Sequence, residues 1–108
     1  MTLFRLTPEA TADLFEIWSY IAAHSPQAAD RVENAVYRAC AFVAAGPLRG
    51  QTRQDLTDRP LRFWTVQRYP NYIVVYDPTT SPVQIIRILH GMRNVRRILA
   101  ESSGSPES

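Results

Sequence analysis

Residues 83–95 run Val83-Gln-Ile-Ile-Arg-Ile-Leu-His-Gly-Met-Arg-Asn-Val95, in which an apolar stretch leads into a basic turn. Val83–Leu89 is rich in isoleucine and is therefore expected to form a strand. His90 and Gly91 end it, and arginines follow at positions 93, 96 and 97. A short helix is expected over Asn94–Ala100. The segment predicts a strand whose end presents concentrated positive charge.

Two further strands are predicted just before this segment. Leu61–Gln67 and Tyr72–Asp77 are apolar and aromatic, and Pro78-Thr-Thr-Ser-Pro82 has the composition of a turn. Short connections between strands favour an antiparallel meander. The polar, arginine-rich stretch Leu48–Pro60 is expected to be a loop. An additional strand is expected at Thr2–Leu6.

The first half of the chain predicts two helices. Thr7-Pro8 and Ser25-Pro26 are typical helix starts, because the hydroxyl can cap the helix and proline is tolerated in its first turn. Gly46-Pro47 is a typical helix end. One short break near His24 separates the helices, which indicates an antiparallel hairpin. Apolar residues recur at helical spacing, and we expect Trp18 to lie in the core.

The element order strand, helix, helix, strand, strand, strand predicts the α+β class. The expected architecture is a helical hairpin packed on a mainly antiparallel four-stranded sheet. One sheet face would bury the hairpin, and the other would be wet or covered by a partner. We expect one domain in residues 1–100 and a disordered tail in residues 101–108.

Composition excludes several classes of protein. The chain has 108 residues, of which 45% are hydrophobic and 20% charged, enough to build one core. It has no apolar run long enough to span a membrane and no signal-peptide pattern, so a cytoplasmic protein is expected. Cys40 is the single cysteine, which rules out an internal disulfide. Neither a phosphate-binding glycine loop nor a metal-ligand cluster is present, so no cofactor is predicted.

The basic residues are distributed unevenly and are of one kind. All twelve are arginine, and nine of them lie in residues 46–100 together with three acidic residues. Arginine binds phosphate and carboxylate well, but it cannot lose its proton to act as a general base. The C-terminal half is therefore the predicted face for an anionic partner.

The order and spacing of several short motifs resemble the ParE/RelE superfamily of bacterial toxins, the ParE branch in particular. These motifs are Arg5-Leu-Thr-Pro-Glu-Ala10, Asp13-Leu14, Ile17-Trp18-x-Tyr20-Ile21, Arg62-Phe63, Arg68-Tyr69, Tyr72-Ile-Val-Val-Tyr76 and Ile86-Arg-Ile-Leu-His-Gly-Met-Arg93. The resemblance implies the toxin of a type II toxin–antitoxin pair, held inactive by a tightly bound ParD-like antitoxin. ParE-like toxins poison DNA gyrase, which stabilises a plasmid or chromosome, whereas RelE-like toxins cut mRNA on the ribosome.

Residue chemistry favours the ParE branch. Cutting RNA through its 2′-hydroxyl needs a base, an acid and positive charge at the phosphate. The resemblance implies that a RelE-like nuclease would combine lysine, arginine and a tyrosine near the C-terminus. This chain has no lysine, and residues 94–99 contain no tyrosine. Arg93 matches the late arginine, and His90 could replace the missing base. The alternative is therefore a ribosome-dependent endonuclease that uses His90 and Arg93.

The residues then divide into two expected surfaces. Those expected to bind the target, gyrase, are His90, Arg93, Arg96 and Arg97. Those expected to bind the antitoxin are Trp64, Arg68, Tyr69 and Arg87; Arg87 lies within a strand and needs an acidic partner, either internal or on the antitoxin. We place Arg87 on one face with Ile85 and Leu89. No catalytic residue is assigned, and contact with nucleic acid is expected only through the target. A third possible function is a module that binds its antitoxin but is not toxic.

Overall fold

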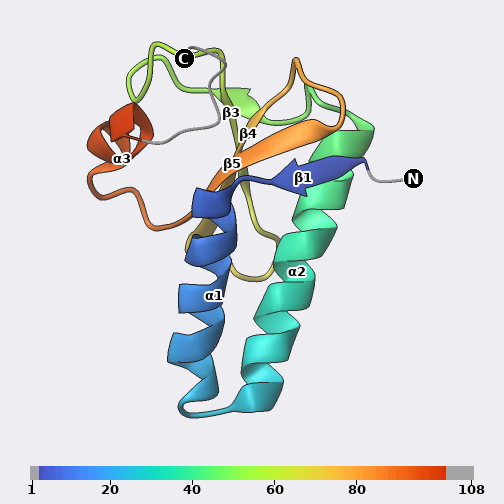
Figure 1. Ribbon diagram of the computed structural model, residues 1–108, viewed down its shortest axis with the longest axis vertical. Coiled ribbons are helices and arrows are strands. Elements are labelled where there is room, and N and C mark those ends of the chain that lie inside the picture. Colours follow the sequence, from blue (N-terminus) through green and yellow to red (C-terminus); the bar gives the residue numbers. More distant parts are fainter. Residues whose placement is uncertain (1–2, 102–108) are drawn as a thin grey trace.

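The computed structural model describes residues 3–101, which begin with a short strand and a helical hairpin. Strand β1 (Phe4–Leu6) leads into helix α1 (Pro8–Ala22), and helix α2 is Pro26–Ala45. The Thr7 and Ser25 hydroxyls accept hydrogen bonds from the third residue after each, so both predicted helix starts are confirmed. Figure 1 shows the two helices side by side, with their connection extending away from the sheet.

Five strands form one mixed sheet in the order β1-β5-β4-β3-β2. β3 (Arg62–Thr65), β4 (Tyr72–Asp77) and β5 (Val83–His90) form the predicted antiparallel meander. β1 pairs with β5 in parallel, through Phe4–Leu6 and Val83–Ile85. The fold class is confirmed, but the sheet has a fifth strand, β2 (Gln51–Thr52), in the segment predicted as a loop.

Both faces of the sheet carry a hydrophobic core. The hairpin covers one face, where Val74, Tyr76, Ile85 and Ile88 pack against both helices. On the other face Phe63, Ile73 and Val75 pack with Leu61 and with helix α3 (Val95–Glu101). The expectation that this second face is wet or left to a partner is wrong, because α3 and the segment before β3 cover part of it. Glu101 belongs to α3, and the rest of the predicted tail lies outside the described residues, as does Thr2.

Because β5 contains a β-bulge, its side chains do not alternate between the two sheet faces as predicted. Val75 pairs with Arg87 and the next residue, Tyr76, pairs with Ile85, so Ile86 is the extra residue. Strict alternation would put Ile85 and Leu89 on one face. Because of the bulge, Ile85 packs in the core under the hairpin and Leu89 in the core under α3.

Trp18 is not a core residue, contrary to the prediction. It is half-buried, and its indole Nε1 donates a hydrogen bond to Asp30 Oδ1 of α2 at 2.9 Å. It lies in the later half of α1, which extends beyond the sheet (Figure 1). No helix in residues 3–101 is both long and apolar enough to cross a membrane.

Candidate functional site

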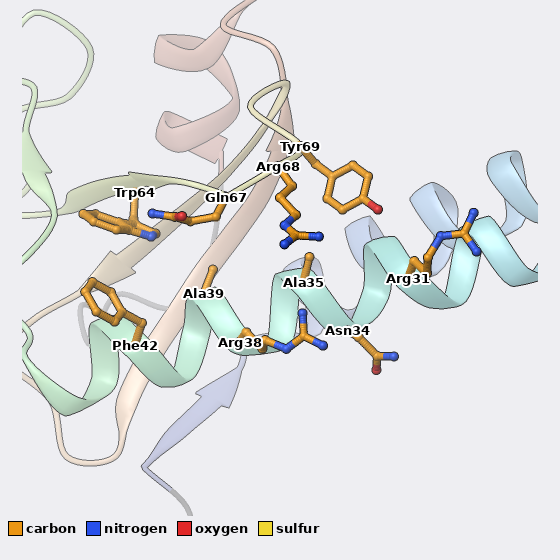
Figure 2. Close-up of a pocket in the computed structure, with 10 residues that line it drawn as sticks. All are labelled: Arg31, Asn34, Ala35, Arg38, Ala39, Phe42, Trp64, Gln67, Arg68 and Tyr69. Carbon is orange, nitrogen blue, oxygen red and sulfur yellow. The ribbon is translucent and has the colours of Figure 1, made fainter.

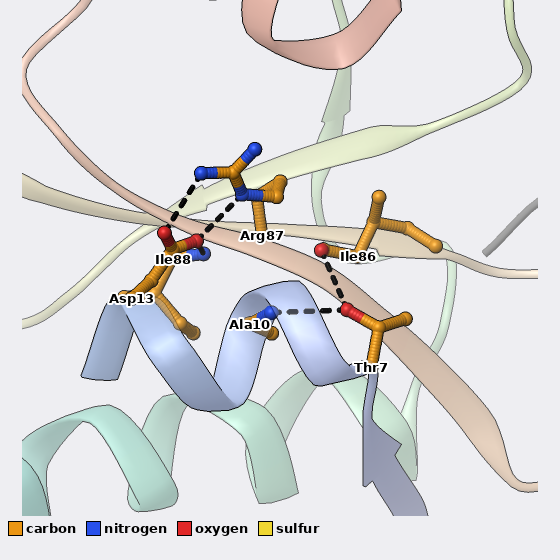
Figure 3. Close-up of polar contacts among 6 residues, drawn as sticks. All are labelled: Thr7, Ala10, Asp13, Ile86, Arg87 and Ile88. Carbon is orange, nitrogen blue, oxygen red and sulfur yellow. Dashed lines mark hydrogen bonds and ion pairs between the residues drawn. The ribbon is translucent and has the colours of Figure 1, made fainter. Parts of the chain in front are cut away.

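The part of the β5 edge that has no neighbouring strand is covered by the start of α1 (Figure 3). β1 pairs with β5 only as far as Ile85, and beyond that point the side chains of Thr7, the N-cap of α1, and of Asp13 in α1 replace it. Thr7 Oγ1 donates to the Ile86 carbonyl at 2.9 Å, and Asp13 Oδ2 accepts from the Ile88 N–H at 3.0 Å. Backbone groups at a sheet edge need partners when they are buried. These two residues therefore hold the half of β5 that leads to His90.

Arg87 forms an internal ion pair with Asp13. Its Nε and Nη2 donate to the two carboxylate oxygens at 2.7 and 2.8 Å, and only 21% of the Arg87 side chain is exposed. The carboxylate of Asp13 raises the pKa of Arg87 above its ordinary value, against the opposing effect of burial. The predicted acidic partner of Arg87 is thus found within the chain, and Arg87 lies apart from the other residues assigned to the antitoxin.

The four expected target-binding residues are all exposed and lie within eight consecutive residues, 90–97, here called the β5 end. His90 is exposed, and its ring stacks on Tyr72 at 5.0 Å between centroids. Gly91 has a φ of +78°, which suits glycine, and its N–H donates to the Asn71 carbonyl at 2.7 Å. Burial raises the pKa of Tyr72, with a smaller contribution from Tyr20. A backbone turn and an aromatic stack thus hold His90 in place.

The three arginines of the β5 end differ in their contacts. Arg96 donates to the Asp55 carbonyl, which ties α3 to the segment before β3. Arg97 pairs with Glu101 at 3.5 Å on the exposed side of α3, where such a pair contributes little. Arg93 is exposed and makes no side-chain hydrogen bond or ion pair with any residue in the described part of the chain.

A groove of about 550 Å³, the α2 groove, separates α2 from the turn between β3 and β4 (Figure 2). It contains three of the four residues expected to bind the antitoxin, namely Trp64, Arg68 and Tyr69. Its other lining residues are Arg31, Asn34, Ala35, Arg38, Ala39, Phe42 and Gln67. The groove therefore combines arginine, aromatic and small side chains.

The contribution of α2 to this groove was not predicted. Arg31, Ala35, Arg38 and Phe42 follow a spacing of four, three and four residues, which places them on one side of a helix. That spacing was available in the sequence. It was missed because the neighbouring core stripe, including Val32 and Val36, accounts for the helix by itself.

Metal and thiol chemistry find no support in this structure. No group of three or more histidine, cysteine, aspartate or glutamate side chains gathers within residues 3–101. Cys40 is fully buried in the core, and burial raises the pKa of its thiol to about 12. A thiol in that environment is a packing residue and not a nucleophile.

Comparison with known proteins agrees with this fold. The family model described as the ParE toxin of the type II toxin–antitoxin system parDE matches residues 4–95. A solved structure titled as the chromosomal ParDE toxin–antitoxin system from P. aeruginosa is similar, with a TM-score of 0.67 and 21% identity. That similarity covers 85% of this chain and 98% of the other. No curated protein matches the chain. Because the family model spans most of the sequence, this chain belongs to the ParE toxin family of type II toxin–antitoxin systems.

Proposed function

We propose that this toxin inhibits DNA gyrase and is neutralised by a ParD-like antitoxin. Membership of the ParE family supports the toxin role and implies the antitoxin. The choice of the target-binding surface rests on an observation at the β5 end. There the guanidinium of Arg93 has no internal partner among the described residues, and His90, three residues earlier in the chain, is exposed. An exposed, uncompensated cation is suited to an anionic partner such as the gyrase–DNA complex.

In this mechanism the toxin supplies binding energy and gyrase does the covalent chemistry. A ligand shifts an equilibrium between states only by the difference in its affinity for them. The toxin would therefore bind more tightly to gyrase holding cleaved DNA than to gyrase holding intact DNA. His90, Arg93, Arg96 and Arg97 are the residues proposed to make that contact, with Arg93 the principal one.

The antitoxin is proposed to bind elsewhere, at Trp64, Arg68 and Tyr69. These residues lie in the α2 groove, which mixes aromatic anchors with arginines in the manner of many protein interfaces. We leave Arg87 out of this surface because Asp13 already neutralises it.

One observation favours the alternative, a ribosome-dependent mRNA endonuclease. The imidazole of His90 is exposed, stacks on the phenol of Tyr72 and lies three residues before Arg93 in the chain. Histidine could take the 2′-hydroxyl proton while arginine offsets the phosphate charge. This reading requires mRNA cleavage on ribosomes that is lost in His90→Ala while the protein stays folded.

The test is supercoiling by purified gyrase in the presence of antitoxin-free wild-type protein, Arg93→Ala or Arg5→Ala. Arg5 is the matched control, because it is exposed on β1 and has no side-chain partner in residues 3–101. Wild type and Arg5→Ala are expected to inhibit equally. Arg93→Ala should require about 10-fold more protein, the cost of losing one charged hydrogen bond. Equal potency of all three proteins would remove Arg93 from the target surface, and no inhibition by wild type would refute the gyrase assignment.

A further inference from the structure

The segment before β3 is hydrogen-bonded to α3 in both directions. Arg96, in the first turn of α3, donates to the Asp55 carbonyl. In return Arg59 Nη1 donates to the Leu99 carbonyl, in the last turn of α3, at 3.0 Å. Figure 1 shows α3 beside this segment and apart from the helical hairpin. Residues 53–61, here called the α3-contact segment, therefore bond to α3 near both of its ends.

Arg59 supplies a partner that the end of α3 lacks. The last four carbonyls of a helix have no acceptor role within it, and in α3 (Val95–Glu101) the Leu99 carbonyl is one of them. A cation at this position also complements the negative end of the helix dipole. A helix of seven residues is too short to persist alone in water. The helical state of α3 therefore depends on contacts such as the one with Arg59.

Turns within the α3-contact segment fix the backbone that carries Arg59. The Arg59 N–H donates to Thr57 Oγ1 at 3.1 Å, and Thr57 is itself buried. The Thr57 N–H donates to the Arg53 carbonyl at 3.2 Å. The Arg53 guanidinium donates to both carboxylate oxygens of Asp55, at 2.9 and 2.8 Å. The half-buried side chain of Arg59 therefore extends from a backbone that is already held in place.

The two hydrogen bonds can fix the orientation of α3, which its apolar contacts do not. Val95 and Leu99 are buried against the sheet. Burial of apolar surface is not directional, so these side chains keep α3 on the sheet without setting its rotation. Hydrogen bonds depend on direction as well as distance. One such bond near each end of α3 sets both its rotation and its position along the helix axis.

The orientation of α3 determines where the cations of the β5 end lie. Arg93 stands between two anchored points, because the Gly91 N–H is bonded to the Asn71 carbonyl and α3 begins at Val95. Arg97 belongs to α3, and 79% of its side chain is exposed. Groups that are already held in the binding geometry lose less conformational freedom when they bind, which increases affinity.

We propose that Arg59 is a positioning residue for target binding, which keeps α3 in the orientation that presents Arg93 and Arg97 to the target. This inference rests on the proposed function, because it takes the β5 end as the target surface. Arg59 acts through α3 and does not itself contact the target. Without its hydrogen bond α3 samples several orientations, and the apparent affinity falls in proportion to the fraction of molecules with α3 in place.

The experiment measures the amount of antitoxin-free protein needed to inhibit supercoiling by purified gyrase, for wild type, Arg59→Ala, Arg59→Lys and Arg62→Ala. Arg62 is the matched control, because it also donates to backbone carbonyls, those of Leu48 at 3.3 Å and Gly50 at 2.7 Å. Arg59→Ala should require about 10-fold more protein, the effect of losing one hydrogen bond from a charged group. Arg62→Ala should stay within about 3-fold of wild type. Arg96 is left intact, since it belongs to the proposed target surface.

Hydrogen exchange and antitoxin binding separate positioning from a general effect on stability. In Arg59→Ala the backbone amides of residues 98–101, followed by NMR, should exchange faster, while those of β4 keep their protection. In Arg62→Ala the α3 amides should exchange as in wild type. Antitoxin affinity should stay within about 3-fold in every variant, because α2 and the turn between β3 and β4 form the α2 groove. If Arg59→Ala does not fold, Arg59→Lys replaces it, with smaller changes expected in the same two quantities.

The outcomes distinguish this proposal from the proposed function. Unchanged exchange of the α3 amides in Arg59→Ala would overturn the proposal, because Arg59 would not hold the helix. Faster exchange with unchanged inhibition would also overturn it, because the orientation of α3 would not matter to the target. Equal losses of inhibition in Arg59→Ala and Arg62→Ala would reduce the effect to general stability. These three results leave the gyrase assignment standing, whereas no inhibition by wild type would refute that assignment and this proposal together.

Discussion

Replacing Asp13 by alanine should strongly destabilise the protein, because this carboxylate closes the free edge of β5. The substitution removes both hydrogen bonds to Arg87, at 2.7 and 2.8 Å, and the acceptor for the Ile88 N–H. Removing one partner of a fully buried ion pair costs about 3–5 kcal/mol. Here Arg87 keeps 21% of its exposure and can be partly rehydrated. We therefore expect a loss of about 3 kcal/mol in the free energy of unfolding, near the lower limit.

Urea unfolding followed by far-ultraviolet circular dichroism measures this loss. In thermal unfolding the same loss corresponds to a fall of about 12 °C in Tm for a domain of this size. Asp58→Ala is the matched control, since Asp58 is exposed and has no side-chain partner among the described residues. It should change stability by less than about 0.5 kcal/mol. In a double-mutant cycle Asp13→Ala and Arg87→Ala should show a coupling of about 1–2 kcal/mol. A coupling near zero, or equal effects of Asp13→Ala and Asp58→Ala, would refute the reasoning.

Four further predictions concern the core. Tyr76→Phe should cost about 1–3 kcal/mol in urea unfolding, because the buried hydroxyl donates to the Pro47 carbonyl at 2.7 Å and accepts from the Gly50 N–H at 2.8 Å; a neutral result would show that water replaces it. Gly50→Ala should lower the free energy of unfolding by about 1–3 kcal/mol, since the new Cβ would lie 2.6 Å from the Tyr76 hydroxyl. As a control, Ala41→Gly at an exposed position of α2 should cost about 1 kcal/mol, because glycine has a lower helix propensity than alanine. The Cys40 thiol should not react with a disulfide reagent at pH 8 until urea unfolds the protein, and rapid reaction of the native protein would contradict its burial. Since the folded pKa of Cys40 is raised to about 12, the unfolded state loses this proton first, and stability should fall as pH rises above about 8.5. The decline should be smaller in Cys40→Ala, where the raised pKa values of Tyr37, Tyr72 and Tyr76 still lower the stability at higher pH.

Local signals predicted the elements of this fold well. Both helix starts follow from a hydroxyl before proline, and Tyr72–Asp77 has the bounds that its apolar and aromatic run indicated. The predicted bounds of the first meander strand, Leu61–Gln67, are wider than the observed Arg62–Thr65. The two-residue strand β2 was missed because it has no pattern of its own. It exists because Gln51 and Thr52 pair with Phe63 and Arg62 across the sheet edge.

Long-range contacts account for what local pattern could not predict. The bulge in β5 depends on the register against β4, so alternation alone misplaced Leu89 relative to Ile85. The Asp13 partner of Arg87 lies 74 residues away in the chain. Similarly, the grouping of Trp64, Arg68 and Tyr69 was expected, but the arginines opposite them come from α2. Their role becomes visible only when the turn between β3 and β4 is placed beside that helix.

Accumulation of cleaved DNA on purified gyrase tests the central claim most directly. Antitoxin-free toxin should trap gyrase–DNA complexes with broken strands, and prior mixing with the ParD-like antitoxin should prevent this. A parallel translation reaction with purified ribosomes should show intact mRNA. Gyrase that is unaffected by excess toxin, together with mRNA cleavage that is lost in His90→Ala, would contradict the account and support the endonuclease. Intact DNA and intact mRNA, with tight antitoxin binding, would instead identify a module that binds its partner without toxicity.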